Sequence, residues 1–135
     1  MRLILYSFLS LILFRCGHNS ASALIVGGTW KTDSVYSYYN GFTSMKYDFE
    51  EEPLRNYASD GKLVMTRGPE SRTFLYVIQN NDSLFHRRPD GTLIEKFLIM
   101  KIDGTNLVLR KELPPVFPGE GQERYLVIYS SRAGE

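Results

Sequence analysis

The sequence is poor in the residues that most often carry catalysis and metal binding. It has one cysteine, Cys16, and two histidines, His18 and His86, in 135 residues. No Cys/His cluster has the spacing of a zinc site, and neither a glycine-rich phosphate loop nor a Gly-x-Ser-x-Gly nucleophile motif occurs. We therefore expect a protein that is not an enzyme and that needs neither a metal nor a cofactor.

His86 is the one residue that suits proton transfer. Its neighbours Phe85, Arg87 and Arg88 favour a histidine on a strand surface instead, and nothing nearby in the sequence supplies a paired base. The acidic residues at 48–52 lack the regular spacing of a calcium loop, so a solvated turn is the favoured interpretation there.

A strong excess of one charge is also missing. Sixteen Lys and Arg against 15 Asp and Glu leave a formal net charge of +1. No basic block or aromatic-interleaved basic patch is present, so nucleic acid is not an expected partner. The length is that of one domain, and the composition is that of an ordinary globular protein.

No apolar run is long enough for a membrane-spanning helix, which needs roughly 20 residues. The longest, Leu3–Phe14, follows a short positive start at Met1 and Arg2 and is closed by Arg15. This pattern is typical of a signal peptide. The alternative is a buried amphipathic helix, which the absence of polar periodicity disfavours.

Two processing sites compete after that run. Leu13-Phe14-Arg15-Cys16 resembles the lipobox of bacterial lipoproteins, although Arg15 stands where a lipobox usually carries a small residue. Ala21-Ser22-Ala23 has the small-x-small form of an ordinary cleavage site. We favour cleavage before Cys16, with cleavage after Ala23 as the alternative.

A lone cysteine in an exported chain cannot form an internal disulfide, and lipidation explains the position of Cys16 best. Acyl chains there would hold the protein on a membrane, since each buried methylene contributes ~0.8 kcal/mol. The expected organisation is a signal peptide over 1–15, a flexible tether over 16–23 and a folded domain over 24–135. The expected location is the bacterial cell envelope, lipid-anchored, or alternatively the periplasm or medium as a soluble protein.

Short β runs and polar turns alternate from Leu24 onward, with Leu24–Lys31 leading into the first strand. Strands are expected at 30–39, 44–49, 62–67, 72–78, 83–88, 92–102, 106–113 and 123–131, and a loop at 50–59. The turns are mostly too short for parallel crossovers. We therefore expect an all-β, antiparallel, up-and-down barrel of about eight strands, with a sandwich as the alternative.

Several motifs in this part of the chain resemble lipocalin-like domains of small bacterial envelope proteins. They are Gly28-Thr29-Trp30, Asp60-Gly61-Lys62-Leu63, Ile102-Asp103-Gly104, Leu107-Val108-Leu109-Arg110 and a closing Tyr-rich strand. The resemblance implies that Trp30 plugs the closed end of the barrel and that Arg132 stacks over it. Such a cation–π contact contributes ~0.5–2 kcal/mol. The alternative is that Arg132 is a solvated terminal residue.

The tyrosines provide the candidate ligand contacts. Tyr36 and Tyr38 share a strand face with Trp30, which predicts that both point into the barrel above the plug. The predicted function is a monomeric, membrane-tethered, lipocalin-like binding protein for a small apolar or amphipathic ligand. The alternative is a filled barrel without a small-molecule ligand, which acts as a structural or interaction module on an envelope protein, in assembly or as an inhibitor.

Overall fold

The structure is a computed structural model that describes residues 20–47, 52–119 and 121–134. The described residues form a short helix and nine strands: α1 (Ala21–Ile25), β1 (Thr29–Tyr39), β2 (Phe42–Tyr47), β3 (Leu54–Tyr57), β4 (Lys62–Arg67), β5 (Glu70–Gln79), β6 (Ser83–Arg87), β7 (Leu93–Ile102), β8 (Asn106–Glu112) and β9 (Arg124–Arg132). The signal-peptide segment 1–15 and Cys16 lie outside the described residues.

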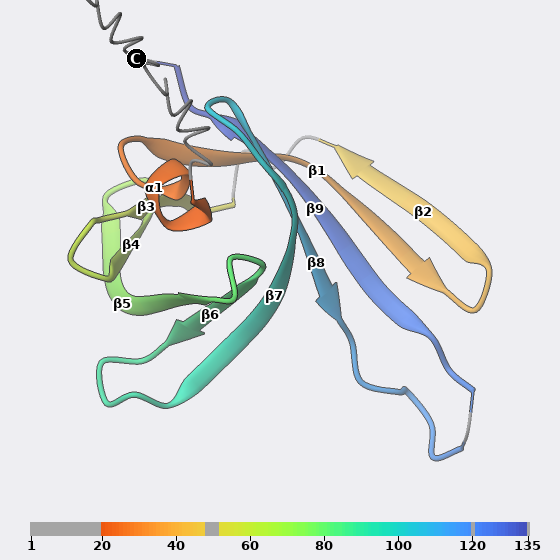
Figure 1. Cartoon of the computed structure of the whole chain (residues 1–135). Helices are drawn as coiled ribbons and strands as arrows, with labels where there is room; N and C mark the ends of the chain where they lie inside the picture. Colours follow the sequence, from red (N-terminus) through yellow and green to blue (C-terminus); the bar gives the residue numbers. More distant parts are fainter. Residues whose placement is uncertain (1–19, 48–51, 120, 135) are drawn as a thin grey trace, which may run out of the picture.

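The strands form one antiparallel sheet that closes on itself (Figure 1). Each strand from β3 to β8 pairs with the next along the chain, and β1 pairs with β3 on one side and with β9 on the other. Eight strands therefore complete a barrel without crossovers, and β2 is an additional strand. This confirms the expected all-β, up-and-down antiparallel barrel.

The loop expected at 50–59 is wrong, because it contains β3. Pro53 and the acidic residues before it resemble a loop, but Arg55 and Tyr57 are buried on one face of β3 between β1 and β4. Tertiary pairing has overridden the weak local pattern of a four-residue strand. β2 and β3 both lie along the same edge of β1, at different heights.

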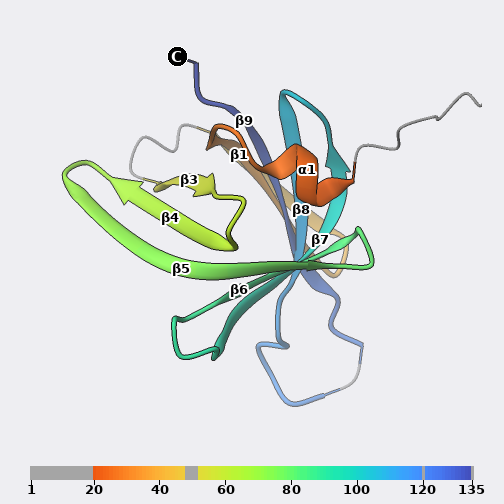
Figure 2. The same ribbon diagram turned by 60° about the vertical axis from the view of Figure 1, so that its left-hand side comes forward.

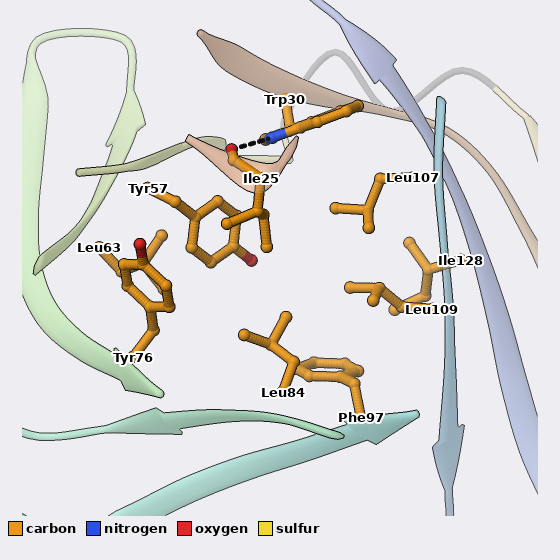
Figure 3. Packing of buried hydrophobic residues seen from close by; sticks show 10 residues of the cluster. All are labelled: Ile25, Trp30, Tyr57, Leu63, Tyr76, Leu84, Phe97, Leu107, Leu109 and Ile128. Carbon is orange, nitrogen blue, oxygen red and sulfur yellow. Dashed lines mark hydrogen bonds between the residues drawn. The ribbon is translucent and has the colours of Figure 1, made fainter. Parts of the chain in front are cut away.

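Helix α1 lies across one end of the barrel (Figure 2). The hydrophobic core packs inside the barrel next to this helix (Figure 3). Its buried members come from α1 and from all eight strands of the barrel: Ile25, Trp30, Tyr57, Leu63, Tyr76, Leu84, Phe97, Leu107, Leu109 and Ile128. The rings of Tyr57 and Tyr76 meet edge to face with centroids 5.0 Å apart. This end of the barrel is closed by packed side chains.

Helix α1 is held at both its start and its side. The Ser20 hydroxyl accepts a hydrogen bond from the Ala23 backbone N–H at 3.3 Å, as an N-cap does. The Ala21 N–H donates to Oδ1 of Asn81 in the β5–β6 turn at 2.6 Å. The segment assigned to a tether, 16–23, therefore overlaps α1 from Ala21 onward, and β1 begins only at Thr29.

The strands diverge at the opposite end of the barrel (Figure 1). β7 and β8 pair only from Leu98 to Ile102 on β7, so the first half of β7 separates from β8. All of β2 is exposed, on both faces. In the part of the chain that the structure describes, no helix is long and apolar enough to cross a membrane.

Candidate ligand-binding cavity

The closed end is built around Trp30 and Arg132. The guanidinium carbon of Arg132 lies 4.3 Å from the centroid of the Trp30 ring. The indole Nε1 donates to the Ile25 carbonyl at 2.9 Å (Figure 3). Arg132 donates from Nη2 to the Leu24 carbonyl at 2.6 Å and from Nε to the Gly104 carbonyl at 2.7 Å. The structure thus brings Trp30 and Arg132 together and joins them to α1.

Gly28 is needed because Arg132 passes so close to it. A Cβ at this position would lie 2.5 Å from Nη1 of Arg132. The guanidinium is held by carbonyls on both sides, so it cannot move aside cheaply. The glycine of the Gly-Thr-Trp motif therefore has a steric role in the plug.

A cavity of about 380 Å3 lies inside the barrel next to this core. It is lined by Thr32, Val35, Ser37, Lys46, Glu52, Arg55, Glu95, Phe97, Lys111, Leu126 and Ile128. Ligand sites usually measure roughly 300–1,000 Å3 and combine apolar walls with a few polar groups. The cavity is therefore of a size that suits a small molecule.

A second cavity of about 570 Å3 lies where β7 and β8 diverge, and it shares Glu95, Phe97 and Lys111 with the first. Nζ of Lys111 on β8 donates to Oε1 of Glu95 on β7 at 2.6 Å. This ion pair bridges a part of the barrel wall where no backbone ladder joins the two strands. The two cavities thus share a charged stretch of the barrel wall.

A buried polar chain continues inward from Glu95. Nδ1 of His86 faces Oε2 of Glu95 at 3.6 Å, and the Tyr57 hydroxyl lies 3.0 Å from Nε2. With the Nδ1 proton directed at the carboxylate, Nε2 accepts the hydrogen bond that Tyr57 donates. The chain therefore runs from Tyr57 through His86 and Glu95 to Lys111.

The environment sets the charge state of each group in this chain. Burial lowers the pKa of His86 below its usual 6.5, with Glu95 opposing. Burial also raises the pKa of the Tyr57 hydroxyl far above its usual range. Hydrogen bonding to His86, and then to Lys111, lowers the pKa of Glu95 to about 2. Near neutral pH the interior therefore holds a neutral histidine and tyrosine beside an ionised carboxylate.

Arg55 supplies a further charge to the cavity. It is only 9% exposed, and Nη1 donates to Oγ1 of Thr32 at 3.2 Å. Among the described residues no carboxylate lies within 4.0 Å of its guanidinium. A buried guanidinium without a carboxylate is costly unless something else satisfies it. This residue brings a positive charge to the wall of the cavity.

Tyr36 and Tyr38 do not lie where the sequence predicted. A bulge in the pairing of β1 with β9, between Thr32 and Ser34, inserts one residue and reverses the alternation beyond it. Val35 and Ser37 therefore line the cavity, and the two tyrosines lie on the other face of β1.

The outer face gives Tyr38 a different set of neighbours. Its ring stacks on that of Tyr125 with centroids 4.7 Å apart and planes 12° apart. The Arg110 guanidinium lies 3.8 Å from the centroid of the Tyr125 ring. The Tyr38 ring therefore takes part in a stack on the outside of the barrel.

Sequence reasoning missed the charged residues that line the interior, and it placed His86 wrongly on a strand surface. His86 is only 2% exposed because it shares the inward face of β6 with Leu84. The carboxylate that His86 faces, Glu95, comes from the paired strand β7 rather than from nearby in sequence. The one sequence feature that indicates a buried His86 is the alternation along Leu84-Phe85-His86, which places His86 on the same face as the apolar Leu84.

In the described parts of the chain, no group of three or more His, Cys, Asp or Glu is arranged to hold a metal ion. Comparisons of the chain with protein-family models, with curated proteins and with solved structures found no match. The fold itself defines the class: a closed eight-stranded antiparallel barrel with an additional strand, compatible with a lipocalin-like fold.

Proposed function

We propose that the protein binds a small apolar or amphipathic ligand inside its barrel, as a lipocalin-like carrier held on a membrane of the bacterial envelope. The observation that carries this proposal is the 380 Å3 cavity, which lies above a packed plug and has both apolar and charged walls. A barrel of eight strands is just wide enough for one small ligand.

Filling the cavity tests this function. Ser37 lines the cavity and Tyr38 follows it on the outer face of β1. Ser37→Trp therefore adds a bulky ring inside the barrel, whereas Tyr38→Trp enlarges a ring that is already present outside it. Binding of the neutral fluorescent probe N-phenylnaphthylamine would be titrated for both variants and the wild type. We expect Ser37→Trp to weaken binding by roughly 10-fold or more, about 1.4 kcal/mol, and Tyr38→Trp to leave it unchanged.

The matched pair separates interior from surface binding. Equal weakening by both substitutions, or none by Ser37→Trp, would place the probe outside the barrel. Absence of saturable binding to the wild type would contradict a carrier function. Thermal melts of both variants verify that each barrel remains folded.

The proposed membrane attachment rests on Cys16 and on the position of α1. Cleavage after Ala23 would remove the Ser20 cap and the buried Ala21, whereas cleavage before Cys16 leaves α1 whole. Radiolabelled palmitate should enter the wild-type chain in a bacterial host and not Cys16→Ala. Equal labelling of the two chains would contradict the attachment.

One observation favours the alternative of an interaction module. β2 is exposed on both faces, and its Phe42 is 77% and its Tyr47 67% exposed. Large exposed apolar side chains on a strand commonly mark a contact with another protein. Native mass spectrometry of the protein extracted from its own host discriminates the two functions, since consistent absence of a bound small molecule would favour the interaction module.

A further inference from the structure

One buried cation inside the barrel lacks a carboxylate partner among the described residues. The described charged residues that line the cavity are the cations Lys46, Arg55 and Lys111 and the carboxylates Glu52 and Glu95. Of these cations Arg55 is only 9% exposed, and its hydrogen-bond partner is the Thr32 hydroxyl rather than a carboxylate. A positive charge on a low-dielectric wall attracts anions.

Arg55 has unused capacity to bind an anion. A guanidinium carries several N–H donors in a planar fork that matches a carboxylate. Among the described residues, Thr32 Oγ1 is its one hydrogen-bond acceptor, at 3.2 Å. The side chain is nine-tenths buried and lines the cavity, so its remaining donors are available to a molecule there.

Lys111 lies in the same part of the cavity. Its ammonium and the Arg55 guanidinium both act electrostatically on His86, and both lower the pKa of that ring. Lys111 is already paired with Glu95, which in turn faces His86. Glu95 therefore offsets Lys111, whereas Arg55 has no carboxylate partner among the described residues.

Apolar side chains line the rest of the same cavity. Phe97, Leu126 and Ile128 come from β7 and β9, and Val35 comes from β1. They offer a surface that suits a short hydrocarbon chain but not a second charged group. The cavity volume limits this chain to a small molecule.

We propose that the ligand is a monoanionic amphiphile whose carboxylate is bound by Arg55 and Lys111 and whose short apolar chain packs on Phe97, Leu126 and Ile128. This inference rests on the proposed carrier function and specifies the class of ligand. The Arg55 guanidinium, which has no carboxylate partner among the described residues, matches one carboxylate in charge and shape. Hydrogen bonds between ionised partners are roughly twice as strong as neutral ones. The carboxylate head group therefore makes the protein select an anionic ligand over a neutral one with the same chain.

Probes that share a chain and differ in head group test the inference. Octanoate, octanol, octylammonium and octyl phosphate would each compete with N-phenylnaphthylamine for the wild-type protein. We expect octanoate to bind roughly 10-fold or more tightly than octanol, and octylammonium to bind most weakly. Tighter binding of octyl phosphate than of octanoate would overturn the carboxylate assignment.

Two substitutions should change the octanoate-to-octanol ratio in opposite directions. Arg55→Gln keeps a hydrogen-bond donor but removes the charge, so the ratio should fall to about 2-fold or less, and Arg55→Lys should restore part of it. Glu95→Gln removes the competing carboxylate, so octanoate should bind roughly 3-fold or more tightly while octanol is unchanged. A gain of affinity cannot come from loss of folding.

The outcomes separate the inference from the function on which it rests. Equal affinity for octanoate and octanol, or a ratio that Arg55→Gln and Glu95→Gln leave unchanged, would overturn the anionic ligand and leave a barrel that binds neutral apolar molecules. If no probe binds, or if Ser37→Trp weakens none of them, the carrier function itself is wrong.

Discussion

Arg132 connects three separate parts of the chain at the closed end of the barrel. Its guanidinium covers the Trp30 ring at 4.3 Å and bonds to carbonyls of Leu24 and Gly104. The same side chain therefore fixes α1, the β7–β8 turn and the start of β1 to one another. Gly28 leaves the space in which it lies.

We expect Arg132→Ala to lower the free energy of unfolding by about 2–3 kcal/mol, since it removes a cation–π contact and charge-assisted hydrogen bonds. The measurements are chemical denaturation and the emission of Trp30, the only tryptophan. Arg132→Lys is the control, because it keeps the charge but loses the planar fork, and it should recover only part of the stability. Unchanged stability and emission in Arg132→Ala would show that the contact does not hold the plug.

The buried polar chain makes stability depend on pH. The pKa of His86 is lower in the fold than its usual 6.5, so the unfolded chain binds a proton first and stability falls as the pH drops below 6.5. The pKa of Glu95 falls from 4.5 to about 2, so its contribution is complete above 4.5 and is lost as the pH falls toward 2. Both groups therefore destabilise the fold in acid.

Melting temperatures measured between about pH 7 and pH 3 check this dependence. His86→Gln should reduce the fall of the melting temperature with pH just below pH 6.5, and Glu95→Gln should reduce the fall below pH 4.5. A wild-type melting temperature that stays constant from about pH 7 to pH 5, or rises, would contradict a buried neutral histidine.

At the scale of elements, the turns and most strands could be predicted because their signals are local. Asn40 and Gly41 both adopt positive φ, 44° and 91°, as a tight hairpin between β1 and β2 requires. Lys62–Arg67 is a strand with the bounds that its residues predict. Such elements can be predicted from the alternation of apolar and polar residues along one strand and from the glycine and asparagine residues in the turns.

Features that depend on partner strands could not be predicted in the same way. The bulge near Asp33 has no glycine or proline to announce it, because Thr32, Asp33 and Ser34 are three ordinary polar residues. It arises from the register of β1 against β9, and it moved Tyr36 and Tyr38 out of the expected interior. β3 was missed for a related reason, because its burial is decided by β1 and β4.

Helix α1 is the element whose contribution is easiest to measure. Ile25 is fully buried, and its carbonyl accepts the Trp30 indole hydrogen bond. We expect Ile25→Ala to cost about 2–4 kcal/mol of stability, as large-to-small substitutions in a core do. Ser22→Ala, at an exposed position of the same helix, should change stability by less than about 0.5 kcal/mol. Similar effects of the two substitutions in denaturant titrations would show that α1 is not part of the folded unit.

At the scale of the whole molecule, the barrel has two unlike ends. Apolar side chains and α1 close one end, whereas a cavity lined by Arg55, Glu95 and Lys111 occupies the interior beyond them. These three residues come from β3, β7 and β8, far apart in the sequence. The all-β barrel followed from local patterns, but the charged site could not, since only closure of the sheet brings these strands together.

The most direct test of ligand binding inside the barrel uses three consecutive residues of β9. Leu126 and Ile128 line the cavity, whereas Val127 lies between them and faces outward. Nuclear Overhauser effects would be recorded between the chain protons of bound octanoate and the methyl groups of all three. We expect cross-peaks to Leu126 and Ile128 and none to Val127. Cross-peaks to Val127, with none to Ile128, would contradict an interior ligand.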